Sequence, residues 1–398
     1  MMKLLWTNLK HFSITSFVLL CLALGLAVVF SIDIDYGDDR RAYKVGGEGP
    51  HVFFAGDQMQ LNFIRGDGET GFYLEQRSLP LAAKVQTQVY FPLEDQHFAL
   101  TIDGSSPDRR PDGSFIPPPQ RYQDGEAILA ISDIESAYKT LRDFLQAHRV
   151  IDAKLNWTFG KGHLVLLGDM TDRGPSTTQV LWLIYQLEQA ARAHGGTVHY
   201  ILGNHEIKNL QGNFQAADKK YQFVATVLGK QQIDLYGENS LLGRWLASKN
   251  TAELINGKLF VHGGLHPKLA TLNYSLEDLN HIVRAHYRTA YFPKKDAALS
   301  DLMLSTRDGP SWYRGYFEAD LSQAEVERTL ATFGASAVVV GHTPQRQVTS
   351  LFEAKVFAIN VRQPRDYRGS IPPRSSEGLL IRDGQYFRLL DDGNAEAL

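Results

Sequence analysis

The most prominent feature of the hydrophobic pattern is an unbroken apolar stretch near the N-terminus. No ionisable side chain occurs from Phe12 to Ile32, and this length suffices for a helix that spans a bilayer. Lysines precede the stretch and aspartates follow it, which by the positive-inside rule places the later residues outside the cytoplasm. A secretory signal cleaved near Ser31 is the competing interpretation. We therefore expect residues 1–32 to be a signal anchor or a signal peptide.

Short apolar runs separated by turn residues follow between residues 50 and 105. They cover residues 51–55, 58–64, 71–74, 85–91 and 98–102, with glycine and aspartate between them. Runs of this length predict strands, so we expect residues 33–105 to form a small β-rich accessory region. Residues 106–124 are rich in proline, glycine and aspartate and show no apolar period, which predicts a linker.

From residue 125 onwards, apolar runs alternate with helical patterns, as is typical of an α/β domain. Residues 176–193 predict a helix with Ser176 as its N-cap, and capping boxes begin at Ser275 and Ser322. Residues 378–390 predict a hairpin that turns at Asp383-Gly384. We assign residues 125–398 to one principal domain.

Five apolar runs in this domain end abruptly in a side chain that can bind a metal. The five residues are Asp133, Asp169, Asn204, His262 and His342. Strands of an α/β sheet present functional groups at their carboxyl ends, where loops converge on one crevice. Because the five residues are far apart in the sequence, they could form a site only in the folded sheet.

Composition narrows the chemistry that such a site can perform. The 41 basic and 44 acidic residues give a net charge of -3 without a long basic run, so bulk nucleic-acid binding is not expected. Cys21 is the only cysteine, which excludes an internal disulfide and a thiolate zinc site. Oxygen and imidazole ligands suit Mn, Fe or Zn. Five such ligands are more than one ion usually needs, so they suit a pair of ions. Two ions stabilise the attacking and leaving oxygens of an in-line displacement, so phosphate-ester hydrolysis is the expected reaction.

The order of the motifs resembles a known family. The segments are Gly168-Asp-Met-Thr-Asp-Arg-Gly174, Gly203-Asn-His-Glu206, Val261-His-Gly-Gly264 and Gly341-His-Thr343. Together they resemble the calcineurin-like metallophosphoesterases, specifically the phosphoprotein phosphatase branch and its bacterial Shewanella-like members, over about residues 125–390. The resemblance implies a four-layer αββα sandwich of two mixed sheets. It also implies hydrolysis of phosphomonoesters at a dinuclear metal centre with a bridging hydroxide.

The resemblance assigns a role to each motif residue. Asp169 would bridge both ions, Asp133 and Glu135 would hold the first ion, and Asn204, His262 and His342 would hold the second. His205 would protonate the leaving oxygen while Asp172 orients its imidazole. The substrate would contact Arg173, Asn204, His205 and a second arginine, Arg314. Glu206 and Asn209 would support the loop after His205.

Glu135 departs from the family pattern, which usually places a histidine two residues after the first aspartate. A third carboxylate favours a harder ion, so we expect Mn or Fe, with Zn as the alternative. The alternative is that Glu135 is not a ligand and marks the start of a helix over 136–148, where negative charge is favoured. A second departure is Asn360, which stands where relatives tend to carry an aspartate.

Arg314 is assigned from Trp312-Tyr313-Arg314-Gly315-Tyr316, which resembles the Shewanella-like form of an arginine-bearing loop. Arg307 is the fallback. The alternative for Arg314 is a surface cation stacked on Trp312 or Tyr316.

The main functional hypothesis is a metal-dependent phosphatase held in the bacterial inner membrane with its catalytic domain in the periplasm, or secreted into the periplasm after cleavage. Its substrate would be a phosphorylated protein or peptide, or a small phosphate ester. The first alternative is a hydrolase of nucleotides or dinucleoside polyphosphates. The second is a membrane-tethered binding module that has kept the fold and lost catalysis.

Overall fold

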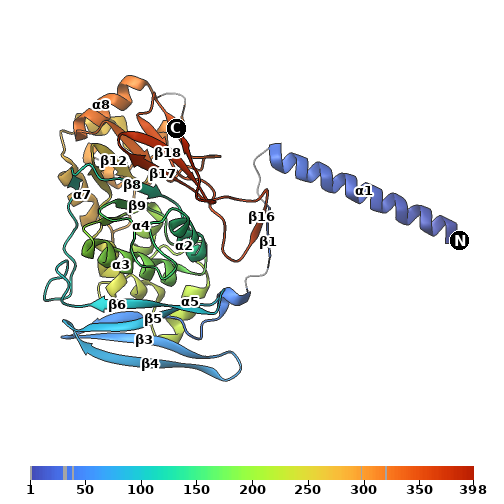
Figure 1. Cartoon of the computed structure of the whole chain (residues 1–398), viewed down its shortest axis with the longest axis horizontal. Helices are drawn as coiled ribbons and strands as arrows, with labels where there is room; N and C mark the ends of the chain where they lie inside the picture. The colour runs from blue at the N-terminus through green and yellow to red at the C-terminus, as the bar shows by residue number, and fades with distance from the viewer. Residues whose placement is uncertain (1, 30–33, 38–39, 297, 319–320) are drawn as a thin grey trace.

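A computed structural model describes residues 2–29, 34–37, 40–296, 298–318 and 321–398. Helix α1 (Met2–Val29) projects from the body of the molecule (Figure 1). Its stretch Leu5–Leu26 has a mean hydropathy of 1.8 and is long and apolar enough to cross a membrane. An N-terminal signal sequence satisfies the same criteria. The expected cleavage position at Ser31 lies outside the described residues.

Two six-stranded sheets form the centre of the fold (Figure 1). The first has the order β10 (Thr197–Ile201), β9 (His163–Leu167), β8 (Ile128–Ile131), β17 (Glu377–Arg382), β18 (Gln385–Leu390) and β19 (Ala395–Ala397). The second has the order β14 (Thr349–Leu351), β15 (Val356–Ala358), β13 (Ala337–Val340), β12 (Lys258–Val261), β11 (Ala252–Ile255) and β7 (Arg121–Tyr122). Both sheets are mixed, because parallel pairs such as β9–β10 and β12–β13 lie beside antiparallel pairs such as β17–β18 and β14–β15.

A shared apolar core holds the two sheets face to face. Ile128 and Val165 of the first sheet belong to the same buried cluster as Phe260 and Val339 of the second. All five residues of β9 are buried, which explains why its sequence is a continuous apolar run rather than an alternating one. β8 and β10 on either side of β9 are also almost wholly buried, whereas β18 and β19 at the other edge of the sheet carry exposed residues.

The helices surround the two sheets. They are α2 (Tyr138–Ala147), α3 (Thr177–Ala193), α4 (Asn204–Leu210), α5 (Lys220–Val227), α6 (Leu241–Ala247), α7 (Leu276–Ala285) and α8 (Gln323–Phe333). Short 3-10 helices are η1 (Arg40–Tyr43), η2 (Gln232–Leu235), η3 (Pro267–Thr271), η4 (Leu299–Leu304) and η5 (Gly315–Phe317).

The predicted local signals match the elements observed. Capping boxes at Ser275 and Ser322 begin α7 and α8, and the hairpin β17–β18 turns at Asp383-Gly384. Ser176 is the N-cap of α3, but its hydroxyl lies 3.2 Å from Tyr367 Oη and does not cap the helix.

The β-rich region forms a three-stranded sheet and a hairpin. The strands are β2 (His51–Ala55), β3 (Gln58–Asp67), β4 (Gly71–Pro80), β5 (Lys84–Phe91) and β6 (Gln96–Asp103). A buried ion pair of 2.8 Å joins Glu48 to Lys220 of α5, and Trp182 Nε1 of α3 donates to Pro50 O over 2.9 Å. These contacts hold the region against the helices of the principal domain.

Two short strands extend the sheets in ways that the sequence pattern does not indicate. β7 lies inside the segment predicted as a linker and pairs with β11. β1 (Ile34–Tyr36) pairs with β16 (Gly369–Ile371), where Asp35 forms ion pairs of 3.0 and 2.9 Å with Arg365 and Arg374. The chain directly after α1 is thus tied to the C-terminal part of the protein.

Candidate metal centre and active site

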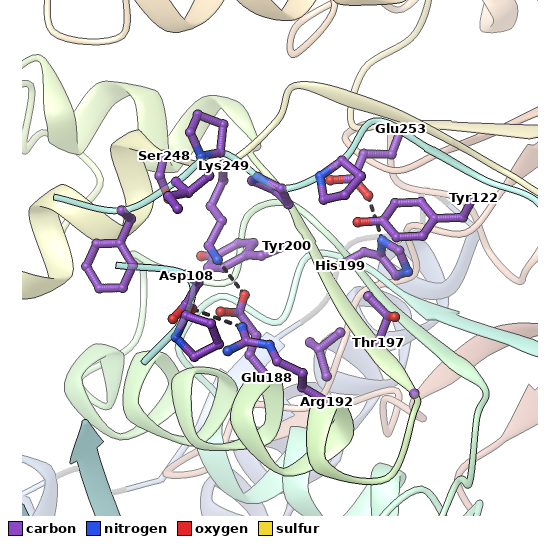
Figure 2. Close-up of a pocket in the computed structure, with 18 residues that line it drawn as sticks. Asp108, Tyr122, Glu188, Arg192, Thr197, His199, Tyr200, Ser248, Lys249 and Glu253 are labelled. Atoms are coloured by element: carbon purple, nitrogen blue, oxygen red, sulfur yellow. Dashed lines mark hydrogen bonds and ion pairs between the residues drawn. The ribbon is translucent and has the colours of Figure 1, made fainter. Parts of the chain in front are cut away.

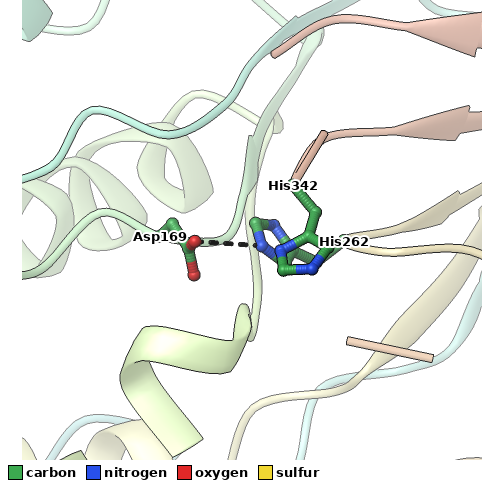
Figure 3. A group of neighbouring side chains, drawn as sticks. All are labelled: Asp169, His262 and His342. Atoms are coloured by element: carbon green, nitrogen blue, oxygen red, sulfur yellow. Dashed lines mark ion pairs between the residues drawn. The ribbon is translucent and has the colours of Figure 1, made fainter. Parts of the chain in front are cut away.

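Three buried side chains from distant strand ends meet at one edge of the sheets. Asp169 follows β9, His262 follows β12 and His342 follows β13. One potential ligand atom from each lies within 4.8 Å of the others (Figure 3). Asp169 Oδ2 is 3.2 Å from His262 Nε2.

Asn204, the first residue of α4, adds a fourth group to this cluster. Its amide oxygen lies 3.3 Å from His262 Nε2, 3.1 Å from Asp169 Oδ2 and 2.9 Å from His342 Nδ1. A rotated amide would place its NH₂ against the same three atoms. Carboxylate, amide and imidazole lone pairs converging on one point fit a divalent transition-metal ion.

The hydrogen bonds around His262 fix which of its nitrogens is available. Nδ1 lies 2.7 Å from Leu167 O, and a carbonyl can only accept, so this nitrogen carries the proton and Nε2 faces the cluster. Burial alone would lower the pKa of His262, but the carboxylates of Asp169 and Asp133 raise it to about 9. The same excess of negative charge favours a bound cation.

Asp133 lies beside the cluster at the end of β8. Its Oδ2 accepts a hydrogen bond of 3.1 Å from His342 N and a second from the hydroxyl of Ser132. Burial, together with repulsion from Asp169, raises the pKa of Asp133 to about 7. A cation would remove this penalty on the ionised form.

Several residues of the site adopt the left-handed backbone region. Positive φ angles occur at Asp133 (53°), Glu135 (52°), Asp169 (54°), Asp172 (72°), Arg173 (56°) and His342 (63°). This conformation is unfavourable for residues with a Cβ and persists only where the surroundings hold it. Its concentration at these strand ends supports a functional role for the loops.

Glu135 contacts the guanidinium of Arg173 in the structure. Its side chain is about 23% exposed, and it is not among the three residues that form the Asp–His cluster. α2 begins at Tyr138, and the first turn of this helix contains no acidic residue. Glu135 therefore lies in the loop before α2 and pairs with Arg173.

His205 and Asp172 form a hydrogen-bonded pair next to Asp169. His205 Nδ1 lies 2.8 Å from Asp172 Oδ2, and Asn209 Nδ2 donates to Asp172 Oδ1 over 2.7 Å. Burial would lower the pKa of His205, but the bond to Asp172 and the charge of Asp169 raise it above its ordinary value. Arg173 Nη2 lies 3.3 Å from His205 Nε2, so an imidazole and a guanidinium lie side by side.

Glu206 organises the loop that carries these groups. Its fully buried carboxylate accepts hydrogen bonds from the backbone N–H groups of Asp169, Met170, Thr171 and Gly203 and from the hydroxyls of Thr171 and Tyr200. Six converging donors require an ionised acceptor with two free oxygens.

We expect Glu206→Gln to destabilise the protein by about 3 kcal/mol, because its NH₂ group would face N–H donors in a buried site. Thermal unfolding without added metal measures this effect. The control is Glu277→Gln, which removes an exposed ion pair with Arg121 and should cost at most about 0.5 kcal/mol. An equal decrease in the free energy of unfolding in both variants would contradict the role given to Glu206.

A cleft of about 720 Å³ opens next to the cluster. Asn204, His342 and Arg314 line it, and Arg314 Nη1 donates to His342 O and to Thr343 Oγ1, each over 3.0 Å. Within the described residues, the Arg314 guanidinium does not lie over an aromatic ring. Arg307 also lines the cleft, but its side chain is 87% exposed.

Lys208 is a cleft residue that the sequence reasoning missed. It lies on α4 four residues after Asn204 and lines the same cavity. The i, i+4 spacing on a short helix places both side chains on one face, a signal that was available from the sequence.

Asn360, the departure noted above, is buried after β15, and its backbone oxygen accepts from Gln345 N over 2.8 Å.

Comparisons with known proteins agree with this geometry. The family model "Calcineurin-like phosphoesterase" matches residues 127–346. Shewanella-like protein phosphatase 2 of Arabidopsis thaliana is 23% identical over 309 residues, which cover 63% of this chain and 75% of the relative. Shewanella-like protein phosphatase 1 of Plasmodium berghei is 27% identical over 246 residues, covering 58% and 66%.

A crystal structure of a cold-active protein-tyrosine phosphatase from a psychrophilic Shewanella species resembles nearly the whole fold. It matches with a TM-score of 0.73 and 30% sequence identity, over 88% of this chain and 99% of that protein. The family match spans more than half of the chain and includes all the motifs described above. The protein therefore belongs to the calcineurin-like phosphoesterase family, has its α/β fold with mixed sheets, and is a hydrolase of phosphoric ester bonds.

Proposed function

We propose that this protein is a metal-dependent phosphoprotein phosphatase with a dinuclear centre. The observation that carries the proposal is the convergence of Asp169, Asn204, His262 and His342, with His205 and Arg173 at its side. The two face-to-face sheets and their surrounding helices support a four-layer αββα sandwich.

The ligand chemistry divides between two ion positions. Asp133, Glu135 and Asp169 would hold the first ion, while Asp169, Asn204, His262 and His342 would hold the second. When bound, the ions would activate water for attack and neutralise charge on the phosphoryl group. With Glu135 in place of histidine, hard oxygen ligands dominate the first position, which favours Mn or Fe over Zn.

The protein's own groups bind the phosphoryl group and move the proton. Arg173 beside His205 and Arg314 beside His342 would bind phosphoryl oxygens through their planar guanidinium groups. His205, whose pKa is raised by its hydrogen bond to Asp172, would donate a proton to the leaving oxygen. The Glu135–Arg173 contact implies that Glu135 must release Arg173 when it turns toward an ion.

The relatives support a phosphorylated protein or peptide as substrate, since those named above are described as protein phosphatases and one as a tyrosine phosphatase. The cleft beside the cluster is open and carries Lys208, Lys268 and Arg314 together with Trp312 and Tyr313. Basic groups beside aromatic rings suit a phosphorylated aromatic side chain. A panel of phosphotyrosine peptide, phosphoserine peptide and dinucleoside polyphosphate decides between this substrate and the nucleotide alternative.

We further propose that α1 anchors the protein in a bacterial inner membrane with the catalytic domain in the periplasm. Its apolar stretch and the lysines before it support this orientation. N-terminal sequencing of the mature protein distinguishes an anchor from a cleaved signal.

Metal analysis of the full chain tests the metal proposal. We expect two ions per chain, loss of hydrolysis after chelation, and recovery with Mn or Fe but not with Zn alone. Glu135→His should restore recovery with Zn, because imidazole is a softer ligand. Full recovery of the wild type with Zn alone would contradict the Mn or Fe preference. A folded protein with neither bound metal nor hydrolysis would favour the binding-module alternative.

A further inference from the structure

The outer edge of β10 lies along a second cavity. β10 is the terminal strand of the first sheet and pairs only with β9 within that sheet. A cavity of about 390 Å³ follows this strand from Gly196 to Tyr200, with residues 115–119 and Lys249 on other sides. Figure 2 shows the lining, with His199, Glu253 and Tyr122 at one end and Glu188, Lys249 and Asp108 at the other.

The hydrogen-bond register identifies which backbone groups face this cavity. Thr197 N donates to Gly162 O over 3.1 Å, so the backbone groups of residues 197, 199 and 201 point toward β9. Those of Val198, Tyr200 and Leu202 point to the outer edge. Leu202 N is bonded to Asn250 O at 3.0 Å. An isolated parallel bridge pairs Ile201 with Asn250, so Asn250 also covers the C=O of Tyr200. Among the described residues, no protein group bonds to the outward N–H and C=O of Val198 or to the N–H of Tyr200.

The opposite wall cannot complete the sheet. It contains Pro117, Pro118 and Pro119, which lack a backbone N–H. Asn250 Nδ2 donates to the carbonyls of Pro118 and Pro119 over 3.2 Å each. These prolines therefore offer no N–H donor to the C=O groups at the edge of β10, and two of their three carbonyls are already bonded.

The charged side chains of the lining are already paired. Arg192 contacts Asp108 at 2.9 Å, Lys249 contacts Glu188 at 2.6 Å, and His199 Nδ1 lies 2.6 Å from Glu253. The remaining lining is largely proline, aromatic and aliphatic. A ligand with charged side chains would find no unpaired partner here, whereas an uncharged one would bury apolar surface.

We propose that this groove binds an extended, uncharged segment of a partner protein as an added strand on β10. In a parallel arrangement, the residue of the segment opposite His199 can bond to both the C=O of Val198 and the N–H of Tyr200. The residue two positions before it can accept a hydrogen bond from the N–H of Val198. The outward backbone groups of β10 repeat at every second residue, and an extended chain presents hydrogen-bonding groups with the same spacing. The side chains of the bound segment would lie against the adjoining apolar residues. This binding site is separate from the hydrolytic one and does not depend on the proposed substrate.

A random library of linear decapeptides displayed on phage, selected against the full chain in detergent micelles, tests the proposal. We expect enriched peptides to contain alternating uncharged apolar residues and to slow hydrogen exchange at the Tyr200 amide. Val198→Pro removes an outward N–H without removing a bond to β9. Binding should weaken about tenfold, as expected for the loss of one buried hydrogen bond. Val198→Ala keeps that N–H and serves as the matched control.

Thr197→Trp is a second variant, in which the larger side chain should occupy the groove and weaken peptide binding. It provides a test that does not require the strand to tolerate a proline. Hydrolysis of a generic phosphate ester, which should be unchanged in all three variants, reports that each is folded. Failure to enrich any peptide would overturn the proposal. Peptides that bind the wild type, Val198→Pro and Thr197→Trp equally would also overturn it, because they would bind elsewhere.

Discussion

Asp169→Asn is expected to abolish metal binding at both positions and to lower kcat/KM by roughly a thousandfold or more, since several kcal/mol of charge stabilisation would be lost. Asp169 Oδ1 accepts a hydrogen bond of 3.0 Å from His205 N, while Oδ2 faces His262. Asparagine has only one oxygen, so its NH₂ would face either the His205 N–H or the ligand cluster. Either orientation opposes the NH₂ to a donor or to the cations, and both lose the negative charge that would offset the repulsion between two cations.

Metal content and thermal unfolding check this expectation independently of activity. A ligand that binds only the folded state raises the unfolding temperature, so added Mn should stabilise the wild type and leave Asp169→Asn unchanged. Asp57→Asn, at an exposed aspartate in the turn between β2 and β3, is the matched control and should behave as the wild type. Retention of two ions by Asp169→Asn would exclude the bridging role.

His205→Asn is expected to lower turnover by roughly 10²–10⁴-fold while both ions stay bound, because it removes a general acid and leaves the ligands in place. The loss should depend on the leaving group. An alkyl phosphate such as phosphoserine peptide needs a proton on the departing oxygen, whereas an ester of an acidic nitrophenol needs little help. We therefore expect a much smaller loss with the nitrophenyl ester.

Asp172→Asn provides the comparison for this variant. This variant keeps the imidazole of His205 but removes the carboxylate that orients the ring and raises its pKa. We therefore expect turnover to depend on the leaving group in the same way, with a smaller loss of turnover than in His205→Asn. Metal depletion in His205→Asn would show that the residue supports the centre rather than donating a proton. An equal loss with both esters would exclude the general-acid role.

Much of the fold was predictable because its signals are local. The apolar N-terminal helix, the capping boxes at Ser275 and Ser322 and the turn at Asp383-Gly384 depend on residues within a few positions of each other. Continuous apolar runs indicated buried strands, and polar residues after them indicated the site. The structure brings Asp169, Asn204, His262 and His342 together at that edge.

The contacts of Glu135 and Glu206 could not be derived in this way. Glu135 contacts Arg173, and Glu206 accepts six hydrogen bonds, five of them from groups other than its own helix start. Such contacts depend on how loops from different strands pack against each other. Sequence spacing does not encode that packing.

The sequence by itself determined where several helices, strands and turns lie, which residues could bind a metal, and that these residues could meet only at strand ends. Only the tertiary structure decided the order of strands in the two sheets, the pairing of β1 with β16 and of β7 with β11, and the open outer edge of β10. The physical reason is that a cap or a turn closes hydrogen bonds within one short segment. Strand neighbours are instead selected by the packing of the whole core, after long loops have closed.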